Sequence, residues 1–182
     1  MVFDMPYNTY RNSREALKNA KIVMKETKSD AIKLEGGKKI IPIVKKLVKN
    51  KIPVMGHVGI LPQTDKKFTF KGKQQKESER ILSDTKLLEN AGVFSIVLEC
   101  IETKLSKKIT QLIKIPTIGI GSSVFCDGQV IVIDDLIGLS QSKFKFVKKY
   151  IDISKIIDGA VKKYKFEVIK KKFPKAKHSF KN

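Results

Sequence analysis

The sequence contains little cysteine, little arginine and no long apolar run. Its 182 residues include only two cysteines, Cys100 and Cys126. Two thiols are too few for a disulfide framework, and neither has a partner at Cys-x-x-Cys spacing, so we expect both to be reduced. No apolar run approaches the length of a membrane span, and the N-terminal residues do not resemble a signal peptide. These absences predict a cytoplasmic protein without a membrane segment.

Basic charge is abundant, but nearly all of it comes from lysine. The formal net charge is +20, and only Arg11, Arg14 and Arg80 are arginines among the 38 Lys and Arg residues. A strongly basic chain attracts nucleic-acid phosphates, whereas bidentate recognition of phosphates and bases favours arginine. The lysines also spread along every expected helix. We therefore favour a lysine-rich composition without a specific nucleic-acid partner, and we keep nucleic-acid binding as an alternative function.

Short apolar runs alternate with longer, lysine-rich amphipathic stretches. The runs predict strands over 2–4, 31–35, 52–57, 94–99, 115–120 and 129–133. The amphipathic stretches predict helices over 14–28, 38–49, 76–90, 103–114 and 152–172. Near-continuous apolar runs are typical of parallel strands that are covered on both faces. The alternation indicates an α/β fold, and we predict a single (β/α)-barrel domain over residues 1–182.

One loop is longer than the others. It spans residues 64–75 and carries several lysines, with Phe68 and Phe70 between them. Because a long loop after a strand is often an active-site lid, we interpret this segment as a candidate lid.

Polar residues end four of the expected strands, namely Asp4, Glu35, His57 and Glu99. In an α/β barrel the active site forms at the carboxyl ends of the strands. Lys33 lies two residues before Glu35, so both side chains point to the same side of their strand, and a lysine there needs an anionic partner. Each residue alone has a structural explanation, such as a helix cap or an ion pair. Their convergence favours a site, and Asp4 with Glu35 suits a hard cation such as Mg²⁺.

Six motifs, in order along the chain, resemble the successive strands of the ketopantoate hydroxymethyltransferase family. They are Phe-Asp-Met-Pro-Tyr at 3–7, Ile-Lys-Leu-Glu-Gly-Gly at 32–37, Pro-Val-Met-Gly-His-Val-Gly at 53–59 with Pro62-Gln63, Val-Leu-Glu-Cys at 97–100, Ile-Pro-Thr-Ile-Gly-Ile-Gly at 115–121 and Cys-Asp-Gly-Gln-Val at 126–130. The resemblance implies a TIM (β/α)8 barrel that forms a homo-oligomer, commonly a decamer. It also implies transfer of a hydroxymethyl group from 5,10-methylenetetrahydrofolate to 2-oxoisovalerate (3-methyl-2-oxobutanoate) in pantothenate biosynthesis.

The resemblance also implies a role for each polar residue. Asp4 and Glu35 match the acids of the family's Mg²⁺ site, and Asp4 thereby contributes to substrate binding. Lys33 would bind the carboxylate or carbonyl of the oxo-acid, and His57 would line the substrate pocket and contact the hydroxymethyl end of the product. Glu99 would be the general base that removes the C3 proton.

The resemblance places Met1 where the family's third strand begins. The expected fold is therefore an incomplete barrel of about six parallel strands, the family's strands three to eight, with flanking helices. In the family, a Gly-Asp-Ser motif on the first two strands supplies a further metal-ligating aspartate and a substrate-binding serine. Three interpretations stay open at this point: a fragment of a longer protein, an inactive product of a decayed gene, and a chain completed by a partner.

A second enzymatic interpretation is a carbon–carbon lyase of the phosphoenolpyruvate mutase and isocitrate lyase kind. Those enzymes share the barrel architecture and a magnesium-bound oxo-acid, and they usually carry a cysteine in the lid. Cys100 and Cys126 both lie outside the expected lid, so this alternative ranks second.

Overall fold

The structure is a computed structural model that describes residues 1–66 and 69–180. The chain divides into two compact units, Met1–Val130 and Ile131–Asn182. The prediction of one barrel domain over 1–182 stays a prediction. Lys67 and Phe68 of the expected lid loop lie outside the described residues.

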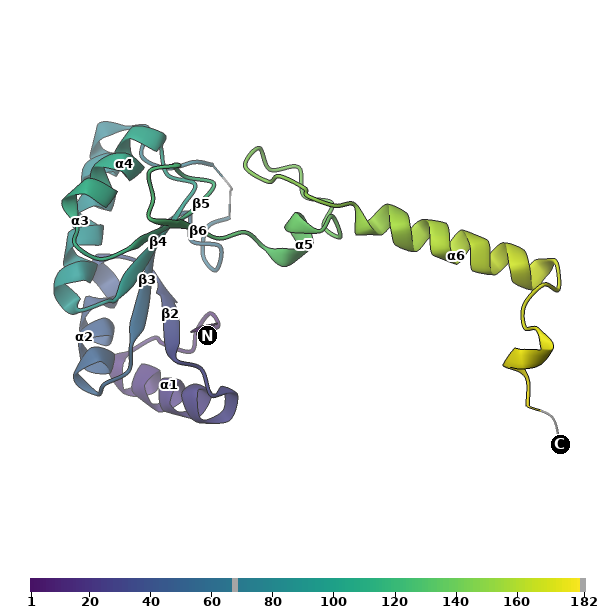
Figure 1. The fold of residues 1–182 in the computed structure, drawn as a ribbon. Coiled ribbons are helices and arrows are strands. Elements are labelled where there is room, and N and C mark those ends of the chain that lie inside the picture. Colours follow the sequence, from purple (N-terminus) through teal and green to yellow (C-terminus); the bar gives the residue numbers. More distant parts are fainter. Residues whose placement is uncertain (67–68, 181–182) are drawn as a thin grey trace. The chain divides into compact units, whose positions relative to one another are not determined.

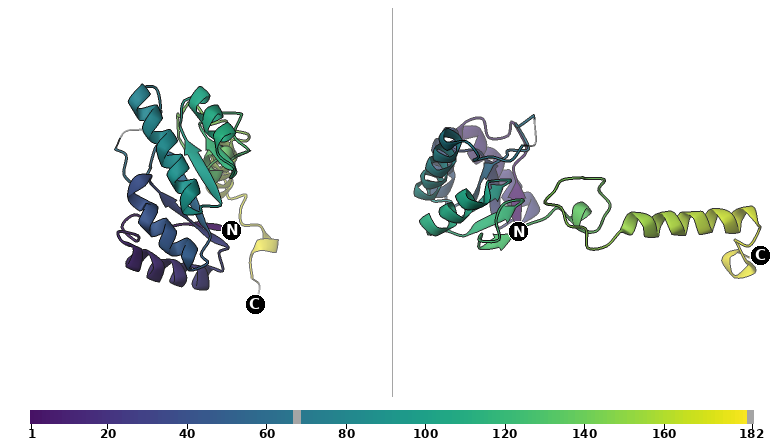
Figure 2. Two further views of the ribbon diagram at one scale, coloured as in Figure 1. Left: turned by 90° about the vertical axis from the view of Figure 1, so that its left-hand side faces the viewer. Right: turned by 90° about the horizontal axis from the view of Figure 1, so that it is seen from above.

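The described part of the first unit forms an all-parallel sheet of six strands that lie in sequence order. The strands are β1 (Val2–Asp4), β2 (Ala31–Glu35), β3 (Val54–Gly59), β4 (Ser95–Glu99), β5 (Thr117–Ile120) and β6 (Gly128–Gln129). The helices between them are α1 (Ser13–Thr27), α2 (Ile41–Lys49), α3 (Gln75–Ala91) and α4 (Thr103–Leu112), with a 3₁₀ turn at Lys38–Ile40. These helices cover one face of the sheet, as Figures 1 and 2 show. The arrangement is an open half-barrel, which confirms the predicted α/β fold and the incomplete TIM barrel.

The strands separate apolar from polar side chains by their two-residue period. Ile32 and Leu34 of β2 and Ile96 and Leu98 of β4 are fully buried in one cluster with apolar residues of the helices. Each such side chain contributes roughly 1.5–3 kcal/mol on burial. The residues that alternate with them therefore face the opposite side of the sheet, which is the inner face of the half-barrel.

The ends of the helices follow local signals in the sequence. Asn12 caps α1, because its side chain accepts hydrogen bonds from the backbone N–H groups of Arg14 and Glu15. Gly92 ends α3 with a φ of 94°, in the left-handed region that glycine adopts at low cost. Helix α4 ends two residues earlier than predicted, because the backbone is already extended at Ile113.

The predicted sixth strand, 129–133, was wrong in its extent. Only Gln129 of that range lies in β6, and the segment from Ile133 begins the short helix α5 (Ile133–Leu136). Val130 still donates a backbone hydrogen bond to the Gly119 carbonyl oxygen at 3.0 Å. Within the described residues, β6 pairs with β5 alone. An edge strand lacks hydrogen-bond partners and cover on one side, so this apolar run has little to bury against.

The second unit contains α5, the long helix α6 (Ile153–Ile169) and a 3₁₀ turn at Ala176–His178. Helix α6 ends three residues before the predicted boundary at 172, and no residue of it is buried in the described part of the chain. Large apolar side chains on α6, among them Ile156 and Tyr164, are exposed. None of the helices in the described part is long and apolar enough to cross a membrane.

Gly59 offers a test of the strand geometry. It adopts a φ of 102°, and a Cβ added there would lie 2.1 Å from the backbone oxygen of Glu99. Gly59→Ala therefore introduces both backbone strain and a clash with an atom that cannot rotate away. We expect it to lower the free energy of unfolding by at least about 2 kcal/mol, as measured by urea denaturation. Gly159→Ala is the control, because nothing lies within 4 Å of a Cβ there; equal losses in both variants would contradict the model of a close strand approach.

Candidate active site

The carboxyl edge of the sheet brings all five predicted site residues together. Asp4, Glu35 and Glu99 are the last residues of β1, β2 and β4, whereas His57 lies two residues before the end of β3. In the strand register, Asp4 is the partner of Lys33 and Glu35 is the partner of His57. Paired residues on neighbouring parallel strands share a face, so these side chains converge on the inner face.

Lys33 lies at the centre of this cluster. Its Nζ is 2.7 Å from Asp4 Oδ2, 3.6 Å from Glu35 Oε1 and 3.2 Å from His57 Nδ1. The Lys33 side chain is only 16% exposed and that of Glu35 is buried, whereas the Asp4 side chain is 52% exposed. An ammonium group this far from water needs anionic partners and acceptors, and the carboxylates of Asp4 and Glu35 lie within contact distance of it. Asp4 is the most exposed of these three side chains.

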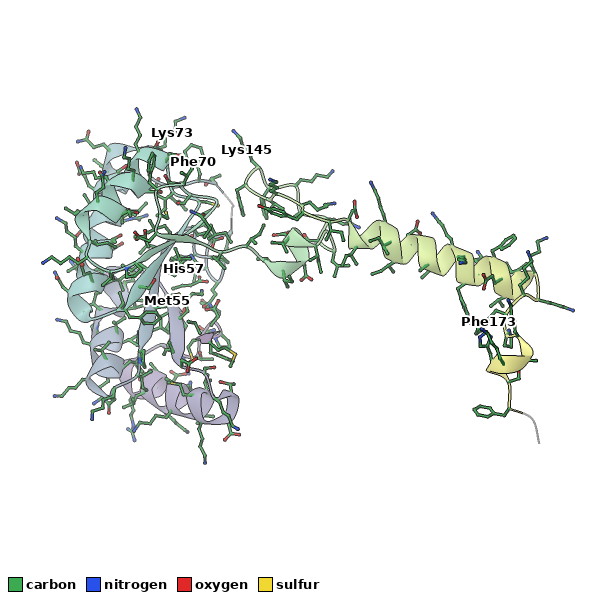
Figure 3. All side chains as sticks on the ribbon, viewed as in Figure 1. Met55, His57, Phe70, Lys73, Lys145 and Phe173 are labelled. Carbon is green, nitrogen blue, oxygen red and sulfur yellow. The ribbon has the colours of Figure 1, made fainter. Side chains whose placement is uncertain are left out.

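His57, which Figure 3 labels among the strands of the first unit, lies within contact distance of both Lys33 and Glu99. An ammonium group has donors only, so His57 Nδ1 must accept from Lys33, and the ring proton must then sit on Nε2. Nε2 lies 3.2 Å from Glu99 Oε2. The two atoms are not aligned for a hydrogen bond, and within the described residues this buried Nε2 has no hydrogen-bond partner. It is a donor that remains available to Glu99 or to a bound molecule.

The sequence patterns did not predict that two further residues, Gln63 and Tyr10, contact the site. Gln63 donates its backbone N–H to Glu35 Oε2 at 3.1 Å, and its side-chain amide donates to the carbonyl oxygen of Met5 at 2.9 Å. Tyr10 donates its hydroxyl proton to Gln63 Oε1 at 2.8 Å. Gln63 stood in a motif of the resemblance, but no spacing rule linked it to Glu35. Loop residues of this kind could be found only from a three-dimensional structure.

A cleft of about 990 Å³ adjoins the cluster. Its walls come from the loops that follow β1, β2 and β3 and from α3, and they include Tyr10, Gly36, Lys71 and Arg80. Of the five predicted site residues only Glu35 lines it. The cleft therefore lies beside the cluster and shares one carboxylate with it.

Asp4 and Glu35 fit a hard divalent cation as a donor set. Both are carboxylates on neighbouring strands, and both already lie within 4 Å of the Lys33 ammonium, so the space near them favours positive charge. Mg²⁺ is usually held by one or two protein carboxylates together with waters and ligand oxygens. In the described part of the chain, no group of three or more His, Cys, Asp or Glu residues could hold a metal ion. The remaining ligands of an ion here would therefore be waters and substrate oxygens.

Burial changes the acidity of two groups near the site. It raises the pKa of Tyr10 to about 12, and the negative charges of Glu35 and Asp4 act in the same direction, while hydrogen bonding with the Glu35 backbone partly opposes the shift. Burial also raises the pKa of the Cys100 thiol to about 11, with a further contribution from the charge of Glu99. Cys100 and Cys126 are both free and buried. The thiol of Cys100 is therefore protonated at neutral pH and is a poor nucleophile.

Sequence comparison decides the family. A sequence model of ketopantoate hydroxymethyltransferase matches residues 1–176. The chain belongs to the ketopantoate hydroxymethyltransferase family. This result does not favour the lyase alternative.

Three relatives illustrate how far the similarity extends, and each is named 3-methyl-2-oxobutanoate hydroxymethyltransferase. The protein from Pelagibacter ubique is 63% identical over 180 residues, which cover 99% of this chain and 70% of the relative. The protein from Carboxydothermus hydrogenoformans is 47% identical over 99% of this chain and 67% of its own length. One from Clostridium botulinum is 46% identical over 100% of this chain and 68% of its own length.

The Lys33–Glu35 contact predicts a strong coupling in stability. Lys33→Met leaves the buried Glu35 carboxylate without its cation, and removing one partner of a buried pair typically costs about 3–5 kcal/mol. We expect the double variant Lys33→Met/Glu35→Gln to recover much of that loss, because no uncompensated charge remains. Urea denaturation in the presence of EDTA measures the free energy of unfolding of the single and the double variant. Arg11→Met breaks an exposed pair with Glu15 and should change stability little; additive losses in the double variant would contradict the coupling.

The raised pKa values of Tyr10 and Cys100 predict a loss of stability at alkaline pH. The unfolded chain releases these protons near the ordinary values of 10.0 and 9.0, before the folded chain does. The folded state then binds more protons than the unfolded state, so the free energy of unfolding falls as pH rises. The stabilisation is complete below about pH 9 and is lost as pH rises toward 12.

Chemical denaturation at stepped pH measures this effect. Tyr10→Phe should flatten the decline above about pH 10, and Cys100→Ala should flatten it above about pH 9. Tyr150→Phe, at an exposed position, should keep the wild-type slope. A wild-type slope in Tyr10→Phe would show that the phenol is not shifted.

Proposed function

We propose that this chain is the catalytic scaffold of a Mg²⁺-dependent transferase that moves a hydroxymethyl group from 5,10-methylenetetrahydrofolate to 3-methyl-2-oxobutanoate. The observation that carries the proposal is the joined cluster of Asp4, Lys33, Glu35, His57 and Glu99 in a member of this family. The names of the relatives support the same reaction. Residence in the cytoplasm and assembly into a homo-oligomer belong to the proposal.

Binding of the oxo-acid is the first task of the cluster. Asp4 and Glu35 would hold the Mg²⁺ ion, and the bound ion supplies Lewis-acid polarisation of the substrate carbonyl. Lys33 adds a positive charge at the same place, since its Nζ lies within 4 Å of both carboxylates. An anionic oxo-acid therefore meets a site whose cationic groups favour its carboxylate and carbonyl oxygens.

Glu99 is the best-placed base. Its buried carboxylate ends β4, on the far side of His57 from Lys33. In the proposed step, Glu99 takes the C3 proton, the electron pair of the C–H bond forms a C2–C3 double bond, and negative charge develops on the carbonyl oxygen. Preorganised positive charge is most effective where such charge develops in the transition state. Lys33 provides this positive charge at one end of the cluster. At the other end, the His57 Nε2–H group lies next to the Glu99 carboxylate.

The second half of the reaction forms the new bond. C3 bonds to the methylene carbon of the folate as one of that carbon's two bonds to nitrogen breaks, and one water molecule supplies the hydroxyl group as the other bond to nitrogen breaks. The proton held by Glu99 and the proton released by the water go to these two nitrogens, and tetrahydrofolate leaves. The cleft beside Glu35 opens between the strand-end loops, and it is the place we propose for the folate.

Proton exchange tests the first half of the reaction without folate. The 182-residue chain is incubated with 3-methyl-2-oxobutanoate and Mg²⁺ in deuterated water, and loss of the C3 proton signal is followed by NMR. We expect exchange that EDTA abolishes. Glu99→Gln should slow it by about 10²–10⁴-fold, because general-base catalysis contributes that much.

A matched variant separates the base from a general charge effect. Glu26→Gln makes the same change at an exposed position on α1 and should leave the exchange rate unaltered. If Glu99→Gln exchanges the C3 proton as fast as the wild type does, Glu99 is not the base. If the folded wild-type chain catalyses no exchange, the proposed function does not apply to this chain.

A further inference from the structure

Gln63 joins three strand-end loops at the site. It follows β3, yet its backbone N–H reaches Glu35 Oε2 at the end of β2, and its side-chain amide reaches the Met5 carbonyl oxygen just after β1. Its side-chain oxygen accepts from the Tyr10 hydroxyl, which lies in the loop before α1. One partly buried residue therefore makes three hydrogen bonds to segments that are 28, 58 and 53 positions away along the chain.

The direction of the Gln63 amide is fixed by its two partners. A carbonyl oxygen can only accept a hydrogen bond, so the –NH₂ group of Gln63 must face Met5. The amide oxygen then faces Tyr10, whose hydroxyl must donate. Tyr10 thus favours the one orientation of the amide that also binds Met5.

These contacts act on both predicted metal ligands. Glu35 has one oxygen, Oε2, on the Gln63 N–H and the other, Oε1, toward Lys33. A contact therefore orients each oxygen of the Glu35 carboxylate. Oε1 is the oxygen that faces the space between the Asp4 and Glu35 carboxylates. Met5 immediately follows Asp4, so a hydrogen bond to its carbonyl oxygen fixes the backbone that carries the second carboxylate.

Neutral hydrogen bonds are well suited to this task. Asp4 and Glu35 carry like charges, and Lys33 alone would hold them near each other only while it stays between them. Hydrogen bonds from uncharged groups hold a carboxylate without competing for the place of a cation. Groups that orient metal ligands in this way typically contribute about 10- to 100-fold to metal affinity.

We propose that Gln63, oriented by Tyr10, is a positioning residue that holds Glu35 and the Asp4 segment in the geometry needed to bind a divalent cation. This inference rests on the proposed function, because it takes the cation to be the one that binds the oxo-acid. It assigns to Gln63 no contact with the substrate.

Metal affinity is the direct measurement. Mn²⁺ alone serves as the probe, and its dissociation constant is measured by titration with EPR detection on the full 182-residue chain. Gln63→Ala keeps the backbone N–H that contacts Glu35 but removes both side-chain hydrogen bonds that hold this residue in place, and we expect it to raise the dissociation constant about 10-fold. Tyr10→Phe removes one hydroxyl and keeps the ring, and it should raise the constant about fivefold, which corresponds to one net hydrogen bond. Gln111→Ala, at an exposed position on α4, is the matched control and should bind Mn²⁺ as the wild type does.

The thermal unfolding midpoint of each metal-free variant distinguishes an effect on the position of the metal ligands from an effect on folding. Positioning predicts weaker Mn²⁺ binding by protein that is still folded, whereas a purely structural role lowers the midpoint and leaves the affinity of the folded protein unchanged. If Gln63→Ala fails to fold, Tyr10→Phe decides by the same criterion. Wild-type affinity in the folded variants would overturn the inference, and the exchange activity of the wild type would still support the proposed function. If Asp4→Asn and Glu35→Gln also leave Mn²⁺ binding unchanged, the metal assignment itself is wrong and the inference fails with it.

Discussion

The buried ammonium group of Lys33 imposes the main constraint on the site. A charge on a strand of a covered sheet is costly unless it is paired and hydrogen-bonded. Lys33 meets this requirement with Asp4, Glu35 and His57, which come from three different strands. The ends of β1, β2 and β3 must therefore keep their present register, because a shift of one residue would turn these side chains to the helix-covered face.

The same two-residue period explains why an apolar core and a polar site can share each strand. Leu34 and Leu98 are fully buried against the helices, while Glu35 and Glu99, one position further, lie on the inner face. Gly59 of β3 is paired with Glu99 of β4, and there is no room for a Cβ at this position. Glycine therefore allows the two strands to approach each other closely beside Glu99. The core thus fixes where the acids lie, and the chemistry of the acids does not have to stabilise the fold alone.

The sequence predicted most of the strands closely, with two exceptions. Strands β1, β2, β4 and β5 lie within their predicted ranges, whereas β3 is displaced by two residues, from the predicted 52–57 to Val54–Gly59. The run at 129–133 is also short and apolar, but it lies where the described sheet ends, so only Gln129 joins a strand. Lys33 and Glu35 were predicted to lie together from their spacing, whereas the contacts of Gln63 depend on how three loops fold. Local spacing carries no information on such contacts.

Two kinds of interaction hold the acids of the site, and they differ in what they permit. The Lys33 ammonium attracts Asp4 and Glu35 strongly, but in the proposed reaction Lys33 would exchange some of those contacts for contacts with the oxo-acid. The hydrogen bonds of Gln63 come from uncharged groups, and the one to Glu35 uses Oε2, whereas Lys33 contacts Oε1. They can therefore persist while the charged partner changes. In the proposed reaction the site would accept both a cation and an anion, and an uncharged support of this kind would keep two like-charged carboxylates in place during the exchange.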